Sequence, residues 1–226
     1  MPGTLTDLFA WVVVATFVAS ALLDVWTDRA RLARGVAALA WLLFAAFWLA
    51  LVPHYVVTLK SYVEGTGAVL AVPACAYAGY LVWTRRPSLL VLSRAVAIMG
   101  VVYLPFITIP ALQRVTVETV THHAEFLMQA LGYSPAVEAG DEGYRSLFVF
   151  TNQSGHRFTT PVLVACSGIG SISIVSGLVL AVKAPLRKKL RGLALVIPLI
   201  YALNIVRVAF IVLAHGQQWF RSEAWL

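Results

Sequence analysis

The sequence predicts an all-α integral membrane protein, built as a polytopic bundle of about six transmembrane helices. Of its 226 residues, 60% are hydrophobic and only 12% are charged, whereas a soluble domain has about 45–50% apolar and about 25% charged residues. Stretches with few charges also recur at the length of roughly 20 residues that a helix needs to cross the hydrocarbon core. Lipid is therefore expected to surround most of the chain, and residues 1–226 are expected to form a single integral membrane domain.

Six segments have the length and composition of transmembrane helices. The first could be mistaken for a signal peptide, because Ala19-Ser20-Ala21 imitates a cleavage site, but the residues before it contain Asp7 and no Lys or Arg. It is therefore predicted to be a span. The six expected spans are residues 8–25, 35–57, 67–84, 95–112, 161–182 and 192–215.

The Lys and Arg residues predict how these spans are oriented. They concentrate after spans one, three and five, whereas the other loops are mildly acidic. By the positive-inside rule the basic loops are cytoplasmic, so both termini are expected outside the cell membrane. The net charge of +7 thus reflects membrane orientation, and no nucleic-acid partner is expected. The residues of the basic loops are Arg29, Arg31, Arg34, Arg85, Arg86, Arg94, Lys183, Arg187, Lys188, Lys189 and Arg191.

A long outer segment, residues 113–160, separates spans four and five. Apolar residues recur in it at helical spacing, which predicts an amphipathic helix on the outer surface. Further on, residues 147–151 and 157–159 flank turn-forming residues, which predicts a small hairpin. The apolar positions of the expected helix are Val117, Val120, Ala124, Leu127 and Leu131.

Arg207 is the one basic residue expected deep inside a span, where an ionisable side chain is costly and therefore indicates a function. Asn204 lies three residues earlier, so both side chains can line one polar site. Span six runs outward, which places Arg207 about 12 Å below the outer end near His215. The alternative is a structural arginine that snorkels or pairs with carbonyl groups.

Cys166 is expected in the same outer leaflet, because span five runs inward from Pro161 and carries the thiol about 7 Å into it. A nearby guanidinium favours the nucleophilic thiolate and could equally stabilise an oxyanion. The small residues Ser167 and Gly168 permit close helix packing and could leave room for a peptide. Alternatively, Cys166 is a packing residue, as is expected of Cys75, and no disulfide framework is expected.

Two short motifs resemble those of the exosortase/archaeosortase family, namely Ala165-Cys166-Ser167-Gly168-Ile169 and Asn204-Ile205-Val206-Arg207. The motif-level match covers residues 161–220, and the first four spans share only hydrophobicity with the family. The resemblance implies a membrane-embedded cysteine transpeptidase that needs no cofactor. Its substrates would be secreted proteins with a C-terminal sorting signal, made of a short motif, a transmembrane helix and a basic tail. In the archaeosortase branch the motif is Pro-Gly-Phe, and surface-layer glycoprotein is among the substrates.

On this resemblance, Cys166 would attack the peptide carbonyl to form a thioester, and Arg207 would orient the thiolate or stabilise the oxyanion. A membrane lipid would then take over the acyl group. The family carries a third polar residue, which in archaeosortases lies in a later span, so we expect this sequence to lack C-terminal spans of the family. His215 is the candidate to replace it as acid or base, although an interfacial histidine beside Trp219 is the alternative.

Other functions remain open from the sequence alone. In a transporter, Arg207 would bind an anion and Cys166 would only pack, but no inverted repeat supports this. A non-catalytic membrane scaffold is a third possibility. An outer metal site is not expected, because no His-Glu-x-x-His pattern exists and adjacent histidines point to different sides of a helix. Its potential ligands would be His122, His123, Glu125 and His156.

Overall fold

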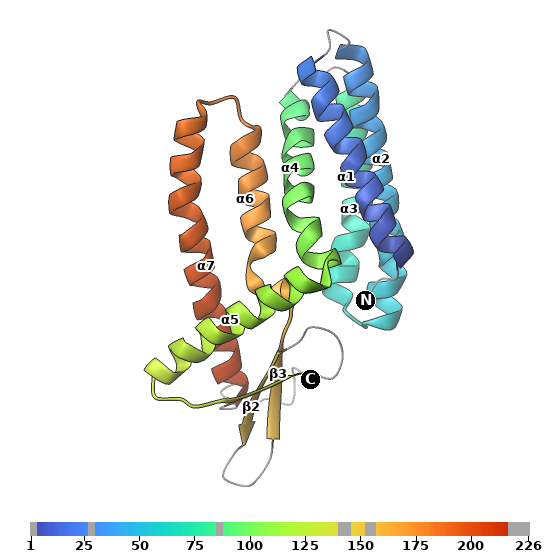
Figure 1. The fold of residues 1–226 in the computed structure, drawn as a ribbon. Helices are drawn as coiled ribbons and strands as arrows, with labels where there is room; N and C mark the ends of the chain where they lie inside the picture. The colour runs from blue at the N-terminus through green and yellow to red at the C-terminus, as the bar shows by residue number, and fades with distance from the viewer. Residues whose placement is uncertain (1–3, 27–29, 85–87, 140–145, 152–156, 217–226) are drawn as a thin grey trace. The chain divides into compact units, whose positions relative to one another are not determined.

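The computed structural model describes residues 4–26, 30–84, 88–139, 146–151 and 157–216, and most of these residues are helical (Figure 1). Helix α2 continues into a π-helical turn, His54–Thr58. A short 3-10 turn, η2 (Val164–Ser167), precedes α6. The helices are α1 (Thr4–Trp26), α2 (Ala30–Pro53), α3 (Tyr62–Trp83), α4 (Ser88–Thr108), α5 (Pro110–Ala130), α6 (Ile169–Ala181) and α7 (Leu186–Gly216). The strands are β1 (Ala136–Ala139), β2 (Ser146–Thr151) and β3 (Arg157–Val162).

Within the described part of the chain, five helical segments are long and apolar enough to cross a membrane. They correspond to five of the six expected spans and confirm the all-α membrane fold. The sixth expected span corresponds to α6, which is apolar but shorter. The five segments are Leu5–Asp24, Arg31–Thr58, Tyr62–Trp83, Leu89–Thr108 and Leu186–Gly216.

The expected start of span five at residue 161 is wrong, because α6 begins only at Ile169. The residues before it belong to strand β3, which pairs antiparallel with β2, and to η2. Pro161 is compatible with this place because β3 is an edge strand, the position in a sheet where proline is tolerated. With 13 residues, α6 is about 20 Å long, less than the roughly 30 Å of a hydrocarbon core.

The elements form two compact units. The first unit comprises Met1–Leu104 and Ser173–Lys189, and thus α1, α2, α3, most of α4 and most of α6. The second comprises Pro105–Ile172 and Leu190–Leu226, with α5, the sheet, η2 and most of α7.

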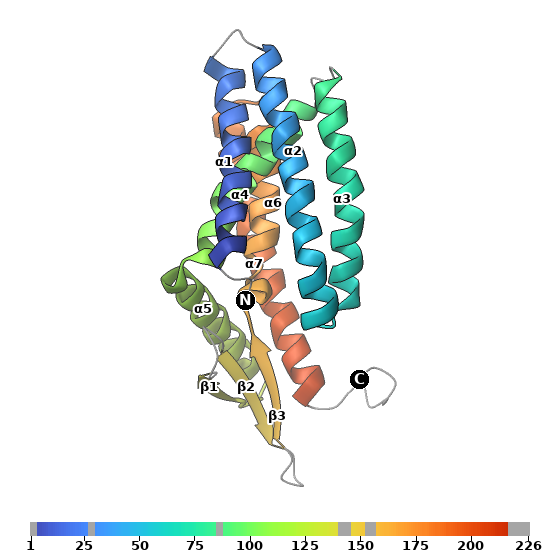
Figure 2. The same cartoon turned by 90° about the vertical axis from the view of Figure 1, so that its right-hand side faces the viewer.

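Aromatic packing holds the first unit together. In Figure 2, α1, α2 and α3 lie side by side, and α2 contacts both of its neighbours. The fully buried ring of Phe17 on α1 meets the Trp41 ring of α2 edge to face, with the centroids 5.2 Å apart. The Trp41 indole N–H donates to Ser93 Oγ on α4 at 2.9 Å. This bond satisfies a polar group that would otherwise be costly inside a bilayer.

The amphipathic helix is confirmed as α5. Its apolar side is buried in a protein core and does not only rest on the outer surface. Val117, Val120 and Ala124 are buried in the core of the second unit, where they meet residues of α7 and of the sheet. Leu131, in contrast, is 59% exposed, and Met128 takes the buried position at this end of the helix. The buried residues contributed by α7 are Ile205, Val208, Ala209, Val212 and Leu213.

The predicted hairpin is also confirmed, as β2 and β3. They pair antiparallel with Phe150 opposite Phe158 and Phe148 opposite Thr160. Strand β1, which was not predicted, pairs antiparallel with the other side of β2 and completes a sheet of order β1-β2-β3. Phe148 and Val162 of this sheet are buried in the core of the second unit, so the sheet fixes where the chain enters η2.

Candidate active site

Cys166 lies on a tight turn between a strand and a helix. Strand β3 ends at Val162, η2 follows, and α6 starts three residues after the cysteine (Figure 1). The Cys166 N–H donates to the Leu163 carbonyl at 2.8 Å, and the thiol is partly buried at the edge of the core of the second unit. A nucleophile presented on a sharp strand–turn–helix corner is a recurrent device, because the corner exposes the side chain next to a helix N-terminus.

Ser167 stabilises this turn through its side chain. Its Oγ donates to the Val164 carbonyl at 2.6 Å and accepts from the Ile169 N–H at 3.3 Å. The serine is buried, so both bonds satisfy groups that water does not reach. Ser167 thus stabilises the η2 turn and links it to the first residue of α6.

Asn204 of α7 ties this turn to the second motif. Its Nδ2 donates to the Cys166 carbonyl at 2.7 Å, and the asparagine is buried. Gly168, in the left-handed conformation with φ of 77°, lets the backbone come this close, because a Cβ there would lie 3.0 Å from Asn204 Cγ. The two motifs, far apart in the sequence, thus meet in one contact.

Arg207 lies one turn beyond Asn204 on α7, and its side chain is exposed. Side chains three residues apart on an α-helix point in directions that differ by about 60° around the helix axis. The buried Asn204 and the exposed Arg207 therefore lie on neighbouring sides of α7. None of the described residues forms a hydrogen bond or ion pair with the guanidinium. The structure thus joins Asn204 to the Cys166 turn, whereas the Arg207 side chain is exposed and forms no hydrogen bond with the described residues of that turn.

His215 is held by the sheet and not by the other site residues. Its Nδ1 lies 2.8 Å from Thr160 Oγ1 of β3, and its ring meets the Phe158 ring edge to face at 6.2 Å. The histidine is exposed at the end of α7. Residues 217–220, the last part of the range 161–220 that resembles the family, lie outside the described residues, and Trp219 is one of them.

A polar pair that the sequence did not single out joins α5 to α7. His123 Nδ1 and Tyr201 Oη lie 2.7 Å apart, and the rings meet edge to face at 5.8 Å. Tyr201 lies one turn before Asn204 and packs on the same core as Cys166. The three-residue spacing of Tyr201 and Asn204 could have indicated that both lie on one side of the helix. Nothing in the sequence links Tyr201 to His123.

The histidines weighed as metal ligands do not converge in the part of the chain that the structure describes. His123 turns to Tyr201, whereas His122 lies 3.7 Å from Glu125. Among these described residues, no group of three or more His, Cys, Asp or Glu side chains could hold a metal ion. His156, the fourth residue considered, lies outside them.

Replacing Gly168 by alanine is expected to destabilise the turn by about 1–3 kcal/mol. The new Cβ would have to adopt a left-handed backbone and press on Asn204 at the same time. Gly132→Ala is the matched control, because Gly132 also has positive φ, 85°, but nothing within 4 Å of an added Cβ. Thermal unfolding of both variants measures the difference, and equal losses would contradict the Gly168–Asn204 contact.

The five long apolar helices among the described residues define a multi-pass membrane protein. In it, a cysteine on a strand–turn–helix corner is hydrogen-bonded through its carbonyl to an asparagine of an apolar helix. The family described as transmembrane exosortase matches residues 5–225, and the chain belongs to this family.

Two curated relatives are similar over most of the chain. Archaeosortase A of Haloferax volcanii is 50% identical over 97% of this chain and 75% of its own length. Archaeosortase A of Natronomonas pharaonis is 43% identical over 98% of this chain and 70% of its own length. No solved structure matches the chain.

Proposed function

We propose that the Cys166 turn is the catalytic centre of a membrane-embedded cysteine transpeptidase. Membership of the exosortase family and the two archaeosortase A relatives support a sortase-like transpeptidase that works in the membrane. The observation that carries the assignment to this site is the hydrogen bond from Asn204 to the Cys166 carbonyl. It joins the η2 turn, which carries the thiol, to α7, which carries the guanidinium.

In the proposed first step, the Cys166 thiolate attacks the carbonyl carbon of the sorting-signal peptide. A C–S bond forms, and the negative charge moves to the carbonyl oxygen. When the intermediate collapses, the C–N bond breaks, the acyl group stays on sulfur as a thioester, and the amine leaves with a proton. The positive end of α6, which begins directly after the turn, favours both the thiolate and the oxyanion.

Arg207 is proposed to stabilise the charge that develops in this step. An exposed guanidinium without a partner among the described side chains has its donors available for the thiolate or for the oxyanion. Such a contact is made mainly in the transition state, because the neutral peptide carbonyl attracts a cation less than an oxyanion does. Arg207 would thereby raise the rate of acylation more than the affinity for the peptide.

In the second step, a lipid nucleophile is proposed to attack the thioester. Its oxygen or nitrogen forms a bond to the acyl carbon, the C–S bond breaks, and the thiol is regenerated. The substrate protein is then linked to a membrane lipid through its new C-terminus. A secreted surface protein with a C-terminal sorting signal of the Pro-Gly-Phe type, such as surface-layer glycoprotein, is the proposed substrate, and the archaeosortase A relatives support this class.

The proposed site faces the outside of the cell membrane, with both termini on that side. The basic residues at the start of α7 favour a cytoplasmic position there. Counted from Arg191, the last basic residue of this stretch, Asn204 lies about 20 Å along α7 at 1.5 Å per residue, in the outer half of a hydrocarbon core of roughly 30 Å. A secreted substrate would therefore reach the thiol from outside.

His215 is the proposed donor of the proton that the leaving amine takes up. Its Nδ1 is engaged by Thr160, so Nε2 is the nitrogen that remains for this role. His215→Gln is expected to lower the rate of reporter cleavage, because glutamine cannot donate the proton that the leaving amine takes up. Thr160→Val tests the Thr160 bond separately, and an unchanged rate in His215→Gln assigns the proton transfer to another group.

The test of the proposed function uses a secreted reporter protein with a Pro-Gly-Phe sorting signal, co-expressed with this chain. A matched reporter carries Ala-Ala-Ala in place of Pro-Gly-Phe. Intact mass spectrometry is expected to show the first reporter shortened at its C-terminus and joined to a lipid, and the second unprocessed. If both reporters keep their C-termini in membranes that contain the folded chain, the proposal is wrong. If both are shortened, the Pro-Gly-Phe assignment alone is wrong.

A further inference from the structure

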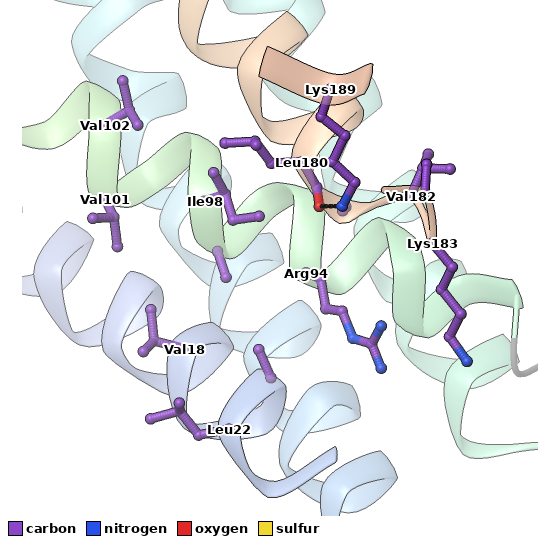
Figure 3. Close-up of a pocket in the computed structure, with 14 residues that line it drawn as sticks. Val18, Leu22, Arg94, Ile98, Val101, Val102, Leu180, Val182, Lys183 and Lys189 are labelled. Atoms are coloured by element: carbon purple, nitrogen blue, oxygen red, sulfur yellow. Dashed lines mark hydrogen bonds between the residues drawn. The ribbon is translucent and has the colours of Figure 1, made fainter. Parts of the chain in front are cut away.

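A groove in the first unit is not used by the proposed reaction. It has a volume of about 500 Å³ and lies between α1, α4 and the connection from α6 to α7 (Figure 3). All the residues that line it belong to the first unit. Its volume falls in the range of roughly 300–1,000 Å³ that is typical of ligand sites.

One part of the groove is apolar and open to the side. It is formed by Val18 and Leu22 of α1 and by Ile98, Val101 and Val102 of α4 (Figure 3). Val101 is 50% exposed and Leu22 is 46% exposed. On helices that are long and apolar enough to cross a membrane, such exposed faces meet the hydrocarbon of the bilayer. The groove is therefore accessible to a lipid chain from the membrane.

The helices around the groove are in close contact at two glycines. A Cβ on Gly177 of α6 would overlap the Ala95 carbonyl of α4, and a Cβ on Gly100 of α4 would overlap the Val14 side chain of α1. Both pairs of helices thus approach as closely as glycine allows. The groove beside these contacts is a formed feature of the unit.

The other end of the groove is positively charged. Arg94, Lys183 and Lys189 gather there, whereas the labelled valines Val101 and Val102 lie at the far end (Figure 3). Asp24 pairs with Arg94 and neutralises one of the three charges. The Arg94 Nε is buried without a hydrogen-bond partner among the described residues, so a ligand would contact only the terminal nitrogens of its guanidinium.

The two lysines also keep donors for a ligand. Lys189 Nζ donates to the Leu180 carbonyl at 2.7 Å, which fixes the ammonium at the end of α6 and uses one of its three donors (Figure 3). Lys183 is exposed at the rim of the groove. Three cations and one carboxylate leave a net charge of about +2 at this end, next to an apolar channel.

We propose that this groove binds an anionic phospholipid. Its phosphate would lie among Arg94, Lys183 and Lys189, and a hydrocarbon chain would follow α1 and α4 past Ile98 toward Val101. A free anion would use only the charged end, and a zwitterionic lipid would bring no net charge, so an anionic lipid alone matches both parts of the groove. Basic pockets between transmembrane helices on the cytoplasmic side commonly bind such head groups.

This lipid is not the acyl acceptor of the proposed reaction. All residues that line the groove belong to the first unit, whereas Cys166, Asn204 and Arg207 belong to the second. By the positive-inside rule, the basic end belongs to the inner leaflet. The proposal stands independently of the transpeptidase assignment, and it predicts that the lipid stabilises the first unit by binding only the folded state.

The experiment uses the full chain purified in an uncharged detergent. Phosphatidylglycerol, phosphatidylcholine or inorganic phosphate is added, and native mass spectrometry and thermal unfolding are recorded for each. One phosphatidylglycerol is expected to stay bound to the chain and to raise the unfolding temperature, whereas phosphatidylcholine and phosphate leave it unchanged. Equal retention of both lipids would overturn the proposal, and an equal shift with phosphate would show a simple anion site in its place.

Two variants separate the phosphate contact from a general charge effect. Lys183→Gln is expected to weaken phosphatidylglycerol binding roughly fivefold, because the loss of one cation next to a lipid phosphate lowers the affinity by about this factor. Lys188→Gln is the matched control, since Lys188 is exposed in the same basic stretch but does not line the groove. Equal effects of the two variants would contradict the site. Val101→Trp, which obstructs the apolar channel, is expected to reduce binding without a change in charge.

Discussion

Cys166→Ala is expected to abolish C-terminal processing of a sorting-signal reporter, a loss of about 10⁴-fold or more, while the protein still folds. Removal of a nucleophile has an effect of this size because no other group can form the covalent intermediate. The fold should tolerate the change, because the thiol is only partly buried and its turn is held by backbone and Ser167 bonds that do not involve sulfur. Reporter mass and thermal unfolding measure the two effects.

Cys75→Ala is the matched control for this experiment. Cys75 is buried in α3 of the first unit, so its replacement removes a thiol of the same kind from a packing position. Processing is expected to persist in this variant. Loss of processing in both variants at equal expression would point to a general thiol effect, and persistence in Cys166→Ala would remove Cys166 from the mechanism.

Arg207→Ala is expected to lower the rate of acylation by about 10²–10³-fold, as the loss of one donor to an oxyanion does in other enzymes. Arg207→Lys is expected to recover part of this loss, because lysine keeps the charge but not the planar fork of donors. Stability should change by less than about 0.5 kcal/mol in both variants, since the side chain is exposed. The measurement is the initial rate of reporter cleavage as a function of reporter concentration.

Arg191→Ala provides the comparison at an exposed position in the basic start of the same helix. It is expected to leave the rate unchanged. An Arg207→Ala variant that cleaves at the rate of Arg191→Ala would assign the guanidinium to packing or solubility. If Arg207→Ala raises only the reporter concentration needed for half-maximal rate, the role of the guanidinium is substrate binding.

Hydropathy was enough to predict most of the helices. A segment that crosses lipid must satisfy its backbone hydrogen bonds internally, which favours a helix. Five of the expected spans are accordingly long helices in the structure. The periodicity of Val117, Val120 and Ala124 also predicted α5 and its buried face correctly. These signals are local, and each can be read within one helix.

The strand–turn–helix corner at Cys166 could not be predicted in the same way. The run from Val162 to Ala165 is apolar throughout, and a short apolar run does not distinguish a buried helix from a strand and turn. The pairing of β3 with β2 and the left-handed Gly168 decide it, and both depend on residues distant in the sequence. The same holds for the bond from Asn204 to the Cys166 carbonyl, whose partners were predicted only to share a site.

The groove could not be predicted from the sequence either. Val18, Ile98 and Val101 are ordinary residues of apolar spans, and nothing in their spacing shows that α1 and α4 leave a channel between them. Arg94 and Lys183 were interpreted only as markers of cytoplasmic loops. Their gathering with Lys189 at one end of the channel is a property of the packing of the first unit.

The central claim is that Cys166 carries the acyl group, and mass spectrometry of the chain itself tests it most directly. The full chain in detergent is mixed with the Pro-Gly-Phe reporter without acceptor lipid, quenched in acid and digested. The account predicts that the peptide containing Cys166 gains the mass of the acyl fragment and loses it again with hydroxylamine, as a thioester does. Cleavage of the reporter with that peptide unmodified, or with the adduct on Cys75, would contradict it.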